Sequence, residues 1–275
     1  MLHSKFSRAV FCSHLILFIA FPFISYQHPQ SNNVSEDDTM AYTAAAVKTN
    51  NFQLNRNAVR FVRNYLQKNN EGLVKIKQRS RSPFRTMDQV FKKYGLPLQL
   101  KYLAVIESEL KQTAVSRVGA VGPWQLMPAT AKILGLTVTP ANDERKQYGK
   151  STKAAALYLR DLYSEFGDWL LVMAAYNCGP GPVYTAIHKS GSRNFWNLQA
   201  YLPGESREHV KKFIATHYYF EGNGSVTTLT KAENIKYSKM LMAEANKQKG
   251  PVPVRQEAWY KNDLEAFEQS IAFGY

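Results

Sequence analysis

Cysteine is scarce in this sequence, and its scarcity excludes one class of architecture. The chain of 275 residues contains two cysteines, Cys12 and Cys178, so a small fold held together by several disulfides is excluded. The histidines, cysteines and acidic residues also lack the spacing of a zinc site. We therefore expect no metal and no other cofactor.

Patterns typical of β-strands are missing as well. Apolar and polar residues do not alternate with a period of two, and the Val/Thr-rich segment 225–230 is the one weak strand candidate. Apolar residues recur instead at helical spacing, in segments bounded by glycine and proline. The sequence therefore predicts a mostly α-helical protein. The expected helices span residues 52–69, 84–94, 97–111, 128–135, 151–166, 169–177, 182–189, 205–220 and 231–249, with Ser151 and Asp168 as N-caps.

The N-terminus has the pattern of a secretory signal peptide. Its first eight residues contain Lys5 and Arg8 and no acidic residue, an apolar run follows to residue 24, and the chain turns polar after Tyr26. We predict a signal peptide over residues 1–25 and export to the periplasm or the outer envelope. An uncleaved membrane anchor is the alternative.

The chain is strongly basic, with a formal net charge of +14. Such an excess favours contact with polyanions or with an anionic surface. For an exported protein the expected surface is the cell envelope. A nucleic-acid partner is not expected, because the sequence contains no nucleic-acid-binding motif.

Composition divides the chain after the signal peptide into four parts. We predict a polar linker over residues 26–50, an N-terminal helical segment over 51–93, a main helical domain over 94–222 and a helical tail over 223–275. Within the helical segment, the basic stretch at 75–85 is expected to be a solvated loop.

One glutamate in the main domain has the setting of a general acid. Pro97 favours a helix start, and the mostly apolar helix that follows places Glu107 near its C-terminal end, on the face of Leu100 and Leu103. Burial and the negative end of the helix dipole would both favour the protonated form of its carboxyl group. A general acid needs that form. On periodicity alone, a glutamate at the rim of the core, paired with lysine or arginine, is the more common case.

Two glycine-rich motifs follow Glu107 along the chain. Residues 116–125 read SRVGAVGPWQ, where two glycines allow a tight turn and a close approach of the backbone to a ligand. Residues 174–181 read AAYNCGPG, where a tyrosine and an asparagine end a helix and can direct hydrogen-bonding groups into a cleft. Each motif alone is weak, because tryptophan beside glycine usually packs and Tyr-Asn at a helix end usually caps.

Taken in order, the motifs are specific to one family. Glu107-Ser108, the segment from Ser116 to Thr130 and Ala175-Tyr176-Asn177-x-Gly179 resemble the lytic transglycosylase catalytic domain, a lysozyme-like family that cleaves peptidoglycan. The resemblance covers about half of the chain and is nearest to the D branch of the membrane-bound lytic murein transglycosylases. It implies a lysozyme-like multi-helix catalytic domain over residues 94–222, with peripheral N- and C-terminal helical segments.

The resemblance also implies roles for the matching residues. Glu107 would be the sole catalytic acid and base, and Ser108 would hydrogen-bond near the cleaved bond. The other residues expected to bind substrate are Ser116, as a turn residue, together with Gln125, Tyr176 and Asn177.

Two departures from the D branch are visible. His209 precedes Val210 where that branch commonly has a Tyr-Val pair, so a hydroxyl role must pass to an imidazole or be lost. Residues 225–275 contain none of the peptidoglycan-binding LysM repeats that the branch usually carries. Binding to the glycan would then depend on the basic surface or on another protein.

A second carboxylate, which ordinary glycosidases require, is not evident. Glu109 points to another side of the helix, and the remaining candidates read as surface or capping residues, namely Asp143, Glu144, Asp161 and Asp168. The resemblance implies a route with one acid, in which Glu107 protonates the glycosidic oxygen between MurNAc and GlcNAc. Glu107 then takes the proton of the C6 hydroxyl group as a 1,6-anhydro ring closes. The alternatives are a hydrolytic muramidase of the goose-lysozyme type and a non-catalytic peptidoglycan-binding protein.

Overall fold

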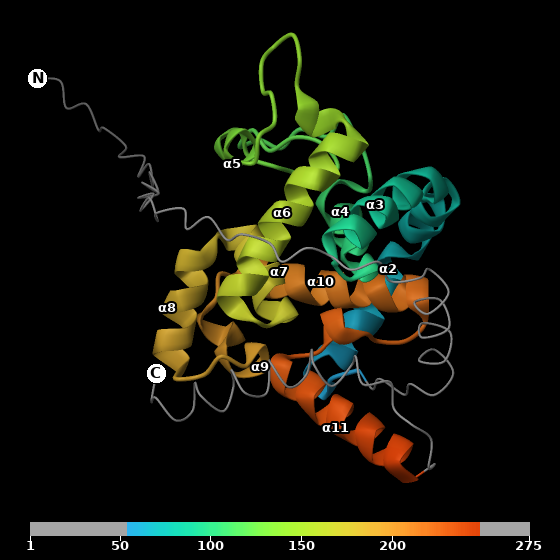
Figure 1. The fold of residues 1–275 in the computed structure, drawn as a ribbon, viewed down its shortest axis with the longest axis vertical. Coiled ribbons are helices and arrows are strands. Elements are labelled where there is room, and N and C mark those ends of the chain that lie inside the picture. Colours follow the sequence, from blue (N-terminus) through green and yellow to red (C-terminus); the bar gives the residue numbers. More distant parts are fainter. Residues whose placement is uncertain (1–53, 248–275) are drawn as a thin grey trace, which may run out of the picture. The chain divides into compact units, whose positions relative to one another are not determined.

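The computed structural model describes residues 54–247 of the chain, and this part is mostly helical (Figure 1). It contains isolated β-bridges and no β-strand, so the predicted mostly-α fold class is confirmed. The predicted signal peptide, the linker and the end of the tail lie outside the described residues. None of the helices between residues 54 and 247 is both long and apolar enough to cross a membrane.

The helices follow one another with short connections, except between α4 and α5 and between α5 and α6. The α-helices are α2 (Arg56–Arg79), α3 (Arg81–Tyr94), α4 (Tyr102–Ser108), α5 (Pro128–Ile133), α6 (Tyr148–Phe166), α7 (Trp169–Cys178), α8 (Pro180–Ser190), α9 (Phe195–Leu198), α10 (Gly204–Glu221) and α11 (Lys231–Lys247). The 3-10 helices are η1 (Leu98–Lys101), η2 (Glu144–Lys146), η3 (Gln199–Tyr201) and η4 (Val226–Thr228).

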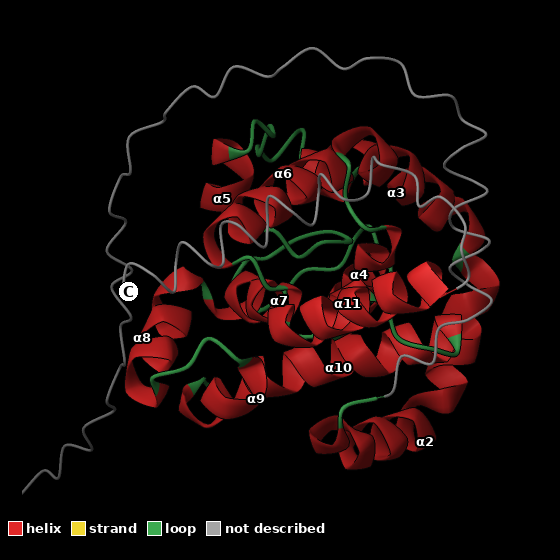
Figure 2. Ribbon diagram, turned by 60° about the horizontal axis from the view of Figure 1, so that its bottom comes forward, coloured by secondary structure: helices red, strands yellow, loops and turns green. Residues whose placement is uncertain are grey.

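Helix α7 is the central helix of the core. Its first seven residues, 169–175, are apolar, and each is at most 5% exposed. Helix α6 packs against one side of α7 and α10 against another, as Figure 2 shows. A helix that is apolar all round is expected where neighbours cover all its faces. The surrounding helices therefore fix the position of its C-terminal end, which carries Tyr176 and Asn177.

The predicted N-cap of α7 is confirmed, and it also holds a second helix. One carboxylate oxygen of Asp168 accepts hydrogen bonds from the backbone N–H groups of Leu170 (2.9 Å) and Leu171 (3.4 Å). The other accepts from the N–H group of Lys231, at the start of α11 (2.6 Å). Burial raises the pKa of Asp168 to about 6, although these three donors act in the opposite direction.

Replacing Asp168 by alanine should lower the free energy of unfolding by about 2 kcal/mol, since two helix starts lose their capping acceptor. Urea unfolding, at a pH where the carboxyl group is ionised, would measure the change. Asp161→Ala is the matched control, because this exposed residue pairs only with its neighbour Arg160 in the described contacts. Its expected change is within about 0.5 kcal/mol. An equal effect of the two substitutions would contradict the capping role.

Helix α10 packs against α2, α7 and α4, and it presents a buried stripe to them. Ser206, His209, Val210 and Phe213 recur at helical spacing along this stripe, and each is at most 7% exposed. The stripe explains why two polar side chains of a surface helix reach the interior of the molecule.

The predictions for the basic stretch 75–85 and for Ser151 are wrong. The basic stretch 75–85 is not a loop, because it forms the end of α2 and the start of α3 around Ser80; Ile76 and Ser80 are buried while the long basic side chains extend outward. Ser151 is not an N-cap, since α6 begins at Tyr148 and the Ser151 hydroxyl group donates to the carbonyl oxygen of Gln147 (2.6 Å).

The weak strand candidate, segment 225–230, forms no strand and contains the 3-10 helix η4. Its hydroxyl groups close a capping box instead: Ser225 Oγ accepts from the N–H group of Thr227, and Thr228 Oγ1 accepts from that of Ser225. Local hydrogen bonds of Ser and Thr therefore prevail over the strand preference of Val and Thr.

Candidate active site

Glu107 lies in the last turn of α4, because the helix stops abruptly after it. Glu109 adopts a left-handed conformation (φ 54°), and so does Leu110 (φ 66°). The predicted helix over 97–111 therefore consists of η1 and α4, and it ends at Ser108. The side chain of Glu107 remains 15% exposed, while Leu103 and Ala104 on the preceding turn are fully buried.

The imidazole of His209 makes the principal contact with Glu107. The distance from His209 Nε2 to Glu107 Oε1 is 2.8 Å, and the histidine side chain is 9% exposed. The other ring nitrogen, Nδ1, is buried and has no hydrogen-bond partner among the described residues. Glu107 is thus paired with an imidazole from α10, rather than with the lysine or arginine expected of a glutamate at the rim of a core.

The Tyr176 hydroxyl group is buried at the end of α7 and feels the charge of Glu107. Burial raises the pKa of the Tyr176 hydroxyl group well above its usual value, and the charge of Glu107 adds to this effect. The phenol therefore stays protonated, and its hydroxyl group donates to the backbone oxygen of Trp124 (2.7 Å). This bond joins the end of α7 to the glycine-rich turn.

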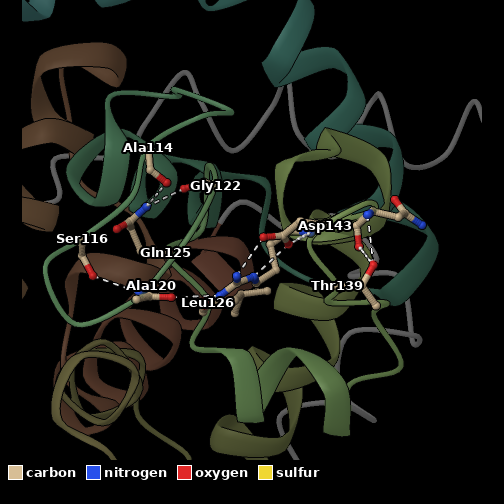
Figure 3. Close-up of polar contacts among 11 residues, drawn as sticks. Ala114, Ser116, Ala120, Gly122, Gln125, Leu126, Thr139 and Asp143 are labelled. Carbon is tan, nitrogen blue, oxygen red and sulfur yellow. Dashed lines mark hydrogen bonds and ion pairs between the residues drawn. The ribbon is translucent and has the colours of Figure 1, made fainter.

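The glycine-rich turn is closed by its own side chains (Figure 3). Ser116 Oγ accepts from the N–H group of Ala120 (2.9 Å). The amide nitrogen of Gln125 donates to the carbonyl oxygens of Gly122 (2.8 Å) and Ala114 (3.3 Å). Gln125 also adopts the left-handed conformation (φ 46°), which side chains rarely adopt. These hydrogen bonds of Ser116 and Gln125 hold the turn in shape.

Ser108 and Asn177 link neighbouring elements in the same way. The hydroxyl group of Ser108 donates to the carbonyl oxygen of Pro123 (2.8 Å), which joins α4 to the turn. Asn177 Oδ1 accepts from the hydroxyl group of Ser206 (2.6 Å), which joins α7 to α10. Hydrogen bonds thus connect the end of α4 with the glycine-rich turn, and the end of α7 with α10. The contacts of the predicted residues with a substrate stay predictions.

An ion pair between Arg145 and Asp143 stabilises the glycine-rich turn, and sequence reasoning missed it. The guanidinium group of Arg145 pairs with Asp143 (2.8 Å) and donates to the carbonyl oxygens of Gly119 (2.9 Å) and Leu126 (3.1 Å). The hydrogen bond from Arg145 lowers the pKa of Asp143. Asp143 does cap η2, as a capping residue would, but Glu144 is buried rather than at the surface.

The nearest acid in sequence points elsewhere, as predicted. Glu109 is exposed and forms ion pairs with Lys111 (2.9 Å) and Arg79 (3.4 Å). The hydrogen bond from Lys111 lowers its pKa, and Arg79 acts in the same direction. Its charge is therefore directed to solvent, away from Glu107. Between residues 54 and 247, no three His, Cys, Asp or Glu side chains gather as metal ligands would.

A match to a known family covers most of this site. The family model of the Transglycosylase SLT domain matches residues 86–199, which include α4, the glycine-rich turn and the end of α7. His209 lies beyond the matched segment.

Individual relatives are similar to less than half of the chain. Membrane-bound lytic murein transglycosylase D of Escherichia coli (strain K12) is 39% identical over 129 residues, which are 45% of this chain and 28% of that protein. Peptidoglycan transglycosylase gp16 of Escherichia phage T7 is 42% identical over 84 residues, 30% of this chain and 6% of that protein. The chain therefore spans less than a third of the length of these relatives.

A solved structure is similar over a comparable part. The 70 kDa soluble lytic transglycosylase of Escherichia coli is 28% identical with a TM-score of 0.45, over 53% of this chain and 26% of that one. The family match over residues 86–199 confirms the resemblance predicted from the motifs.

Proposed function

We propose that the chain is a peptidoglycan lytic transglycosylase, with Glu107 as its single catalytic acid and base. The observation that carries this proposal is the position of Glu107. Its carboxyl group is mostly buried in the last turn of α4, contacts an imidazole at 2.8 Å and lies beside the turn and helix end that match the family.

The proposed reaction cleaves the β-1,4 bond between N-acetylmuramic acid and N-acetylglucosamine without water. The protonated carboxyl group of Glu107 gives its proton to the glycosidic oxygen, and the C1–O bond breaks. The acetamido group of the substrate stabilises the positive charge that develops at C1. The carboxylate then takes the proton of the C6 hydroxyl group, whose oxygen bonds to C1 and closes a 1,6-anhydro ring.

One residue can fill both roles because the proton that leaves Glu107 in the first step is replaced in the second. A mechanism with one carboxylate agrees with the position of Glu109, the nearest acid in sequence. Glu109 faces solvent and two cations. We propose Ser108, Ser116, Gln125, Tyr176 and Asn177 as the residues that shape the sugar-binding cleft.

We further propose that the protein acts outside the cytoplasm, in the periplasm or at the outer envelope. Its N-terminal sequence has the pattern of a signal peptide, and peptidoglycan lies outside the cytoplasmic membrane. The net charge of +14 favours contact with an anionic envelope surface.

Digestion of purified sacculi tests the reaction type. Mass analysis of the released muropeptides should find 1,6-anhydro-muramyl ends, because water takes no part in the proposed ring closure. Reducing muramyl ends, each heavier by one water, would instead indicate the hydrolytic muramidase. Binding to sacculi without release of any muropeptide would indicate the non-catalytic peptidoglycan-binding protein.

A further inference from the structure

The imidazole ring of His209 contacts Glu107 through Nε2, while its Nδ1 atom faces the interior of the protein. It lies on the buried stripe of α10, one turn after Ser206, which is bonded to Asn177 at the end of α7. The ring is held between α10 and α4 with 7% of the residue exposed. Its Nε2 atom faces Glu107 Oε1, and Nδ1 is enclosed without a partner among the described residues.

From this arrangement we infer that His209 is a positioning residue, whose Nε2–H group donates to Glu107 Oε1 throughout the reaction and confines the acidic proton to Oε2. The inference rests on the proposed role of Glu107. It concerns a residue outside the segment that matches the family, at a position where the D branch commonly has tyrosine.

In the base half of the reaction, Glu107 is a carboxylate. A carboxylate has no proton, so both of its oxygens can only accept hydrogen bonds. With Nε2 at 2.8 Å from Oε1, the ring must then carry its proton on Nε2. A bare Nε2 would place two lone pairs against each other in a mostly buried site.

The buried Nδ1 atom of His209 limits where the ring can carry a proton. A buried donor without an acceptor is costly. Protonation of Nδ1 would create such a donor, because no acceptor for it is described. The imidazole therefore neither becomes doubly protonated nor moves its proton from Nε2 to Nδ1, and one neutral tautomer persists through the cycle.

In the acid half of the reaction, Glu107 is a carboxylic acid with one proton. If Nε2–H still donates to Oε1, that oxygen is the carbonyl oxygen of the carboxylic acid, and the proton must lie on Oε2. The Oε2–H bond breaks when the glycosidic oxygen is protonated, and it forms again when the C6 hydroxyl group gives up its proton. His209 gains and loses no proton in either half.

Tyr176, the other titratable group that interacts with Glu107, does not disturb this arrangement. Its hydroxyl group donates to the carbonyl oxygen of Trp124 and stays protonated, because burial raises its pKa well above the usual value. A tyrosine in place of His209 would have a hydroxyl group that can both donate and accept. The fixed imidazole can only donate, so it selects one oxygen of Glu107 as the acid.

Substitutions at His209 separate this role from simple packing. His209→Phe keeps a ring and removes the donor, and we expect kcat for glycan cleavage to fall about 10- to 100-fold, the effect of losing a hydrogen bond to a charged group. KM should change by less than about 2-fold, since the substrate itself loses no contact. His209→Gln restores an amide donor at about the position of Nε2, and most of the lost kcat should return.

His217→Phe is the matched control, because His217 is also a buried histidine of α10. Its Nε2 contacts Ser225 Oγ (2.8 Å) rather than an acid, so its substitution should alter thermal stability and leave kcat unchanged. Wild-type kcat in His209→Phe would overturn the inference. So would a kcat for folded His209→Gln as low as that of His209→Phe.

Nitrogen NMR of the ¹⁵N-labelled wild-type imidazole gives a second and independent test. We expect the signals of a neutral ring with the proton on Nε2 and a bare Nδ1, and a proton on Nδ1 would overturn the inference. This measurement does not depend on turnover. If the protein cleaves no glycan, the proposed function fails while the tautomer of His209 is still decided.

Discussion

Glycan cleavage should fall by roughly 10²- to 10⁴-fold when Glu107 is replaced by glutamine, the range for losing a general acid and base. Glutamine has nearly the same shape and can still accept the hydrogen bond from His209 through its amide oxygen. It cannot donate an acidic proton or take one back. We therefore expect a folded protein with wild-type thermal stability and almost no release of soluble muropeptides from sacculi.

Glu109→Gln is the control for this prediction. Glu109 is two residues away, exposed, and bonded to Lys111 and Arg79 instead of His209. Its substitution removes two surface ion pairs, which contribute little to stability, and should leave the cleavage rate near that of the wild type. Comparable rates for wild type and Glu107→Gln would exclude Glu107 as the acid, whatever the products of the wild-type enzyme are.

The sequence identifies Glu107 because its setting is local. The apolar spacing after Pro97 and the position near the helix end both depend on residues within a few turns. The cap of α7 by Asp168 and the left-handed glycine after α3 are equally local signals, and the structure has both. The early end of α4 is not predictable in this way, because the two residues that stop it, Glu109 and Leu110, are not ones that usually adopt left-handed conformations.

Contacts between distant segments account for two features that the sequence does not give, the contact of His209 with Glu107 and the support of the turn by Arg145. His209 is 102 positions from Glu107, and only the packing of α10 against α4 brings them together. Arg145 is 26 positions from Gly119 and has no periodic or motif signal. The sequence therefore indicates the proposed acid and the turn, whereas the contact of the acid with His209 and the support of the turn by Arg145 depend on the tertiary fold.

The second large effect is expected for Gly122→Ala, in the glycine-rich turn that Arg145 supports. Gly122 has φ +83°, and a Cβ atom built there would lie 2.0 Å from the carbonyl oxygen of Arg145 and 2.7 Å from its carbonyl carbon. The backbone of Arg145 cannot easily retreat, because its guanidinium group is tied to Asp143, Gly119 and Leu126. We expect destabilisation of more than about 4 kcal/mol, in the range of the most damaging substitutions.

Gly119→Ala separates this steric clash from backbone strain. Gly119 has almost the same conformation, φ +86°, but a Cβ atom there would have nothing within 4 Å. Its substitution should cost only the strain of a left-handed residue, about 1–2 kcal/mol. Urea unfolding of the two variants measures the difference in their stability. If Gly122→Ala gives no soluble protein while Gly119→Ala is recovered normally, the steric clash is likewise the larger effect. Equal stabilities would show that the backbone of Arg145 yields, and that the ion pair does not hold the turn rigidly in place.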